Sequence, residues 1–120
     1  MAKLLEFQGK ELERRRGLAV GTVKVSLLLE TAKGIIFAYE SCVASPRVVS
    51  AIFGAVDFTK DMRVKLTSEG EEQKYGRRHM AVAARAAGVV AIDAPFVAYQ
   101  DMDAFAANVR DGRQWGTRAA

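Results

Sequence analysis

Three acidic residues each close an apolar run of the sequence. Glu30 ends VKVSLLLE at 23–30, Asp57 ends VVSAIFGAVD at 48–57, and Asp93 ends GVVAID at 88–93. Strands that are apolar throughout are buried on both faces, as in parallel sheets covered by helices, and the carboxyl ends of such strands carry the chemistry. Because adjacent parallel strands lie roughly 5 Å apart, Glu30 and Asp57 could converge on one hard divalent cation, usually Mg²⁺.

Each of these acids also has a purely structural interpretation. Glu30 follows three leucines and must meet solvent, a cation or a hydrogen-bond donor, so a helix cap or an ion pair would satisfy it as well as a ligand would. Asp57 could cap the next turn, although the small residues Gly54 and Ala55 would let a ligand approach the backbone there. Asp93 is the weakest candidate because the proline two residues later favours a role in a turn.

The elements that must position these acids alternate between helix and strand. We expect helices over 3–16, 31–45, 71–87 and 102–114, strands over 23–30, 48–56 and 88–93, and a long polar loop after residue 57. The strand ends are 27 and then 36 residues apart, and this βα repetition predicts a parallel sheet with right-handed crossovers. The sequence therefore predicts an α/β fold with about three parallel strands and flanking helices. Since a further strand is due after the last helix, we expect part of a larger (β/α)₈ barrel.

The composition is that of one ordinary globular domain. Half of the 120 residues are apolar and 27% are charged, and no apolar run approaches the roughly 18 residues that span a membrane. The first residues have no apolar core of a signal peptide, and the single cysteine, Cys42, excludes a disulfide framework. These features predict a cytoplasmic protein with no membrane partner. His79 and Cys42 have no catalytic partner in the sequence, and the glycines form no nucleotide-binding motif.

The formal charge of +4 raises the question of an anionic partner. The basic residues are scattered, with short clusters only at 14–16 and 77–78, whereas nucleic-acid-binding proteins usually gather cations on one face. We therefore expect no nucleic-acid partner. A modest basic excess suits an anionic small ligand, and a small basic domain for an anionic partner remains an alternative.

Four segments of the sequence carry a resemblance to a known family. LLLETAKGIIFAYE, SPRVVSAIFGAVDFTKDM, YGRRHMAVAARAAGVVAIDAPF and the D-M-D run at 101–103 resemble the HpcH/HpaI aldolase and citrate lyase β-subunit family. Within it, the likeness is greatest to the citrate lyase β-like and malyl-CoA lyase enzymes. The spacing of the ET-x-x-G block from the FG-x-x-D-x-T block is the most specific part of this resemblance.

The resemblance implies a (β/α)₈ TIM barrel in which residues 1–120 form a single partial domain, from the central to the late βα units. It implies a lyase that uses Mg²⁺ to cleave a carbon–carbon bond in the CoA thioester of a small hydroxy acid, such as malyl-CoA, citramalyl-CoA or a citryl thioester. Glu30 and Asp57 would be the metal ligands and catalytic residues. Glu30 and the backbone N–H groups of Gly54, Ala55 and Val56 would bind the substrate. The implied partners are the acyl-CoA thioester and a small oxo or hydroxy acid, and full-length members would be homo-oligomers.

The sequence also departs from the family pattern. A full barrel needs roughly twice this length, and the match lacks an upstream strand with a substrate-binding arginine, the eighth strand and a C-terminal lid. The resemblance therefore implies that the chain is inactive alone. The alternative is a catalytically degenerate fragment that acts only through assembly.

Overall fold

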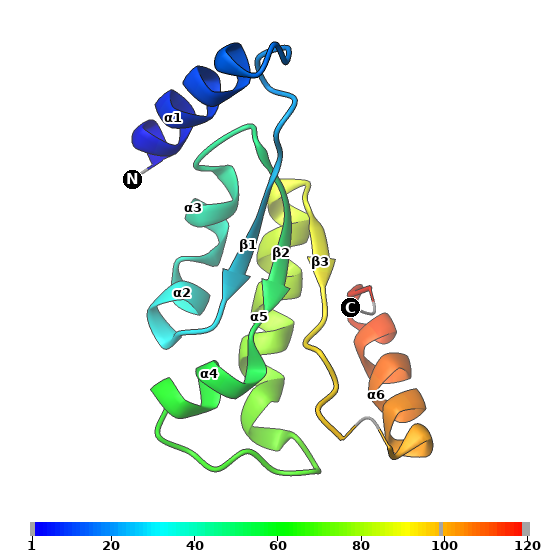
Figure 1. Ribbon diagram of the computed structural model, residues 1–120. Helices are drawn as coiled ribbons and strands as arrows, with labels where there is room; N and C mark the ends of the chain where they lie inside the picture. The colour runs from blue at the N-terminus through cyan, green and yellow to red at the C-terminus, as the bar shows by residue number, and fades with distance from the viewer. Residues whose placement is uncertain (1, 99, 119–120) are drawn as a thin grey trace.

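The computed structural model describes residues 2–98 and 100–118, which alternate between helix and strand (Figure 1). The elements are α1 (Ala2–Arg15), β1 (Val25–Leu29), α2 (Ala32–Ile36), α3 (Ala38–Val43), β2 (Val48–Phe53), α4 (Ala55–Asp61), α5 (Glu71–Ala87), β3 (Val90–Ile92) and α6 (Met102–Gln114). Among these helices none has both the length and the apolar character needed to cross a bilayer.

The three strands form one parallel sheet in the order β1-β2-β3. Leu29 of β1 lies opposite Phe53 of β2, and Ile52 of β2 lies opposite Ile92 of β3. Arg118 continues this pattern beside β3, because its N–H donates to the carbonyl of Ala91 at 2.9 Å and its carbonyl accepts from the N–H of Asp93 at 2.8 Å. The predicted parallel α/β fold is confirmed, and Arg118 pairs where the sequence predicts a further strand.

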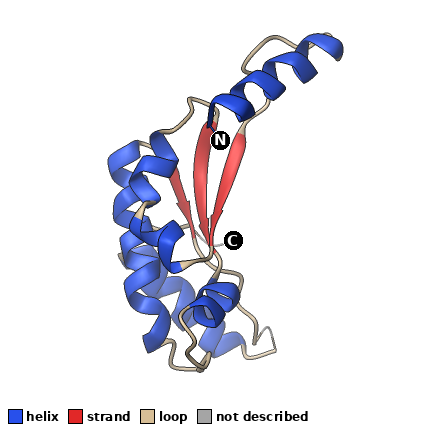
Figure 2. Cartoon of the chain, turned by 90° about the vertical axis from the view of Figure 1, so that its left-hand side faces the viewer, coloured by secondary structure: helices blue, strands red, loops and turns tan. Residues whose placement is uncertain are grey.

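One face of the sheet carries the packed core. Helices α3 and α5 pack against this face, and Figure 2 shows the main group of helices on one side of the strands. Phe53, Ile35 and Met80 are fully buried between these helices and the sheet. Gly76 of α5 permits this packing, because a Cβ atom there would lie 2.9 Å from the ring of Phe58.

The opposite face of the sheet has no covering helix within the described residues, so the expectation of helices over both faces is wrong for this part of the chain. Leu28 is 54% exposed on β1. In a (β/α)₈ barrel this face of every strand points into the barrel interior, where other strands cover it. A strand with apolar residues on both faces is therefore as typical of a barrel wall as of a sheet covered by helices on both sides.

The structure corrects the sequence prediction after β2. The strand ends at Phe53, and α4 begins at Ala55 where we predicted the last strand residues and a loop. Phe58 and Thr59 are buried, and they hold this short helix against the body of the protein. Asp57 thus lies in the first turn of a helix, where the helix dipole stabilises a negative charge.

The predicted helix over 31–45 is two short helices that meet at Phe37. Thr31 caps the first of them by accepting a hydrogen bond from the N–H of Gly34 at 2.9 Å. The small side chains Ala38 and Cys42 of α3 are buried in the core. Their size permits close contact between α3 and β2.

Helix α1 is joined to the sheet by a buried ion pair. The Glu13 carboxylate accepts hydrogen bonds from both Arg47 terminal nitrogens, at 2.6 and 2.8 Å, and from the N–H groups of Gly21 and Val23, at 2.9 and 2.7 Å. These contacts, first those with Arg47, lower the pKa of Glu13 to about 2 against the desolvation that opposes them. The position of α1 therefore depends on an ionised Glu13.

Candidate metal centre

Glu30 lies directly after β1, half-buried, at the carboxyl edge of the sheet. Its side chain is in close contact with Gly54 at the end of β2. A Cβ atom at Gly54 would lie 2.5 Å from Glu30 Cβ and 3.1 Å from Glu30 Oε2. The glycine is therefore required if Glu30 is to keep its position. Thr31, rather than Glu30, caps the following helix, so the helix-cap interpretation of Glu30 is wrong.

Asp57 lies one turn into α4, which begins directly after Gly54. Our prediction that it closes the second strand is wrong, because the chain turns into a helix three residues earlier. Its side chain is 56% exposed, and Oδ1 accepts a hydrogen bond from Lys60 Nζ at 2.8 Å. Asp57 thus presents a carboxylate to solvent at the same edge of the sheet as Glu30.

Lys60 brings the two acids into one electrostatic environment. The hydrogen bond to Asp57 raises the pKa of Lys60, and the negative charge of Asp57 raises it further. The charge of Glu30 contributes in the same direction. The ammonium group therefore contacts Asp57 directly, whereas Glu30 acts on it only through its charge.

The donor set at this edge suits a hard divalent cation. Within residues 2–98 and 100–118 no group of three or more His, Cys, Asp or Glu side chains is placed to hold a metal. Mg²⁺ is commonly bound by one or two carboxylates, with waters and substrate oxygens completing its shell, so it needs no larger protein cage. The assignment of Glu30 and Asp57 as its ligands stays a prediction from the sequence.

Asp61 connects the two elements that carry the acids. Its Oδ2 accepts a hydrogen bond from the N–H of Ala32 at 2.7 Å, which joins the end of α4 to the turn after Glu30. Sequence reasoning singled out neither Asp61 nor Lys60. Both lie three or four residues from Asp57, a spacing that is informative only once the segment is known to be a helix.

The first turn of α4 also offers backbone donors. Gly54 donates its N–H to the carbonyl of Leu29 at 2.9 Å, so that group is already used in the sheet. The N–H groups of Ala55 and Val56 are in the first turn, where helical geometry provides no acceptor within the helix. Of the three N–H groups predicted to bind a substrate carboxylate, those of Ala55 and Val56 remain available for that role.

Comparison with known families settles the relationship of the chain. A sequence model of the HpcH/HpaI aldolase/citrate lyase family matches residues 1–119. The chain belongs to this family. Its members among the curated proteins include the β subunit of citrate lyase from Leuconostoc mesenteroides subsp. cremoris, which is 35% identical over 101 residues. That match covers 84% of this chain and 33% of the relative.

A second relative is a CoA-ester lyase by name. The L-malyl-CoA/β-methylmalyl-CoA lyase of Cereibacter sphaeroides (strain ATCC 17025) is 29% identical over 116 residues, covering 82% of this chain and 36% of the lyase. This HpcH/HpaI family chain therefore spans about a third of the length of the curated relatives that it matches. The predicted family is confirmed.

A solved structure supports the fold as well. The malate synthase of Haloferax volcanii, solved as a magnesium/glyoxylate complex, superposes with a TM-score of 0.78 at 25% identity, covering 92% of this chain and 34% of that one. The same enzyme has been solved with pyruvate and acetyl-CoA, with a TM-score of 0.79. The three strands and flanking helices are thus similar to part of a TIM-barrel-like enzyme.

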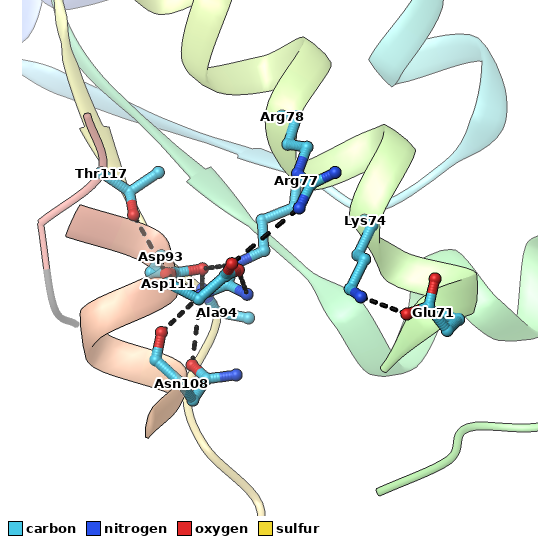
Figure 3. A network of polar contacts seen from close by, with 9 residues as sticks. All are labelled: Glu71, Lys74, Arg77, Arg78, Asp93, Ala94, Asn108, Asp111 and Thr117. Atoms are coloured by element: carbon cyan, nitrogen blue, oxygen red, sulfur yellow. Dashed lines mark hydrogen bonds and ion pairs between the residues drawn. The ribbon is translucent and has the colours of Figure 1, made fainter. Parts of the chain in front are cut away.

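Asp93, the third acid of the sequence pattern, has a different environment in this family member. It is 4% exposed, and its carboxylate accepts hydrogen bonds from Arg77 Nε at 2.6 Å, from Arg77 Nη2, from the N–H of Ala94 at 2.9 Å and from Thr117 Oγ1 at 3.0 Å. Arg77 also donates to the Asp111 carboxylate at 3.0 Å and to the backbone carbonyl of Asn108 at 2.9 Å. Figure 3 shows these groups pointing toward one another from α5, β3 and α6.

We call this group the β3–α6 cluster; its members are Arg77, Asp93, Asn108, Asp111 and Thr117. Gly112 is required beside it, since a Cβ atom there would lie 2.1 Å from Asp93 Oδ2. Every acceptor position of Asp93 is directed at a protein donor, so its role is to hold α5 and α6 to the end of β3. The turn-forming interpretation understated this role, because the partners are distant in sequence.

Proposed function

We propose that this chain contains the metal- and oxo-acid-binding part of an Mg²⁺-dependent carbon–carbon lyase. The substrate would be the CoA thioester of a small hydroxy acid of the malyl-CoA, citramalyl-CoA or citryl type. The observation that supports this most is the contact of Glu30 with Gly54, which places that carboxylate beside the helix that carries Asp57. The similarity to the malyl-CoA lyase and to the magnesium/glyoxylate complex of malate synthase supports the same proposal.

Each residue of the centre has a separate task in this proposal. Glu30 and Asp57 supply the carboxylate ligands, and the Asp61 hydrogen bond to Ala32 fixes the two elements that carry them. Bound Mg²⁺ would polarise an oxygen of the oxo or hydroxy acid as a Lewis acid. The N–H groups of Ala55 and Val56 would receive the substrate carboxylate, since they point away from the helix and have no intrahelical partner.

Turnover requires more than this centre. We propose that the purified 120-residue chain does not cleave the thioester, because it spans about a third of the length of its relatives. The anion formed when the carbon–carbon bond breaks needs its own electrostatic stabilisation, which two carboxylates cannot provide. Turnover of malyl-CoA by the purified chain would show that this proposal is wrong.

Binding of the oxo acid tests the proposed function directly. Glyoxylate or oxaloacetate is titrated calorimetrically into the chain with and without Mg²⁺, and we expect binding only when the metal is present. The matched variant is Glu30→Gln, which keeps the shape of the side chain and should abolish the Mg²⁺-dependent heat. Equal binding without Mg²⁺, or by Glu30→Gln, would contradict the proposal.

A further inference from the structure

A lysine of the protein, Lys60, places a positive charge beside one of the candidate metal ligands. Lys60 lies three residues after Asp57 on the same short helix, and its Nζ donates to Asp57 Oδ1 at 2.8 Å. The ammonium therefore lies over the first turn of α4, at the carboxyl edge of the sheet. This is the edge at which Glu30 contacts Gly54.

An ammonium group and Mg²⁺ compete for the same oxygen atoms of a carboxylate. Both are hard cations that bind its oxygen atoms, and Mg²⁺ accepts only a near-ideal octahedral arrangement at short distance. An oxygen atom that accepts from Lys60 must release or share this contact before it can ligate the metal. The positive charge of Lys60 would also repel a divalent ion at close range.

We propose that Lys60 and a divalent cation compete for Asp57, so that Mg²⁺ binds only when the Lys60 ammonium has moved away. This inference rests on the proposed function, because it assumes that Glu30 and Asp57 are the metal ligands. The observation that carries it is the hydrogen bond from Lys60 Nζ to Asp57 Oδ1 at 2.8 Å.

The metal can displace Lys60 from Asp57 at small cost. Its side chain is 71% exposed and that of Asp57 is 56% exposed, and exposed ion pairs of this kind contribute little free energy. The other charged group of α4 near the turn, Asp61, is occupied by the N–H of Ala32. Lys60 can therefore turn to solvent at small cost when the metal arrives.

The experiment is a calorimetric titration of MgCl₂ into the wild-type chain and into Lys60→Met. We expect Lys60→Met to bind Mg²⁺ about two- to fivefold more tightly than the wild type, and the difference to shrink as salt screens the charges. Lys60→Arg should restore the wild-type affinity because it restores the competing cation. Circular dichroism and the rise in melting temperature with Mg²⁺ provide a second measurement of the same affinities.

Lys24→Met is the matched control. Lys24 directly precedes β1, at the opposite end of that strand from Glu30, so this variant has the same net charge as Lys60→Met but leaves the centre unchanged. Unaltered or weaker Mg²⁺ binding by Lys60→Met would overturn the inference. Equal tightening by Lys24→Met would also overturn it, since the effect would then come from net charge.

The proposed function fails in a different way. If Mg²⁺ binds but Glu30→Gln and Asp57→Asn leave its affinity unchanged, the metal centre is wrongly placed. If those two variants abolish binding while Lys60→Met behaves as wild type, the centre is correct and only the competition is wrong. If neither the wild type nor Lys60→Met binds Mg²⁺, both proposals are overturned.

Discussion

Replacing Arg77 with methionine tests the structural role assigned to the β3–α6 cluster. The substitution keeps much of the side-chain volume and removes the guanidinium group, which supplies two of the four hydrogen bonds to Asp93. The carboxylate, in a residue that is 4% exposed, would then keep only two neutral donors, Ala94 N–H and the Thr117 hydroxyl. Removing one partner of a buried pair in this way costs about 3–5 kcal/mol.

This loss is large against the roughly 5–15 kcal/mol that stabilises a domain. We expect Arg77→Met to lower the free energy of unfolding by about 3–5 kcal/mol, measured by urea denaturation at pH 7. The control is Arg110→Met, an exposed arginine of α6, which should change the stability by no more than about 0.5 kcal/mol.

The double variant Arg77→Met/Asp93→Asn provides an internal check, because it removes the buried charge as well as its partner. Its cost should be smaller than the sum of the two single costs by at least about 1 kcal/mol. Additive costs, or a cost for Arg77→Met below about 1 kcal/mol, would refute the assignment. A loss of Mg²⁺ binding in folded Asp93→Asn would instead restore Asp93 as a functional residue.

Three further predictions follow from single contacts. Gly112→Ala should lower the free energy of unfolding, measured in urea, by about 1–3 kcal/mol, because its Cβ would overlap the β3–α6 cluster. Helix propensity alone predicts the opposite, a gain of about 1 kcal/mol. Ala107→Gly in the same helix is the control, and a stabilised Gly112→Ala would contradict the packing. The pKa of Glu13 is lowered from 4.5 to about 2 in the folded chain, so between these pH values the unfolded chain binds a proton that the folded chain does not. The contribution of Glu13 to the free energy of unfolding is therefore fully present above pH 4.5 and is lost as the pH falls toward 2. Glu13→Gln should make the free energy of unfolding depend less on pH between 4.5 and 2. An unchanged dependence on pH would contradict this role of Glu13. Gly54→Ala should weaken Mg²⁺ binding in a chain still folded by circular dichroism, since its Cβ would displace Glu30; wild-type affinity would refute that contact.

Periodicity and apolar runs predicted the elements that are long or uninterrupted. Helix α6 has the predicted bounds, α5 begins and ends where expected, and β1 and β3 lie within the predicted runs. The location of Glu30 at a strand end followed from the same reasoning. These features are local, because each depends on a pattern within one continuous segment.

The features that could not be predicted depend on contacts between distant segments. Helix α4 was hidden because apolar residues on both sides of Gly54 read as one continuous strand, whereas the chain turns into a helix after Gly54 and buries Phe58. The role of Asp93 depends on Arg77, sixteen residues away, and on α6. On α5, Tyr75 and Val82 are each 64% exposed, because the small residues of that helix face the sheet instead.

A calorimetric titration of Mg²⁺ into the wild type, Glu30→Gln and Asp57→Asn tests whether these two carboxylates hold the metal. Both substitutions replace a carboxylate by an amide of the same shape, so the fold should be preserved while a charged metal ligand is lost. Asp103→Asn, an exposed acid in the first turn of α6, is the matched control. We expect the wild type and Asp103→Asn to bind Mg²⁺ with the same affinity, and the heat of binding to disappear in Glu30→Gln and Asp57→Asn. Unchanged affinity in Glu30→Gln and Asp57→Asn would contradict it.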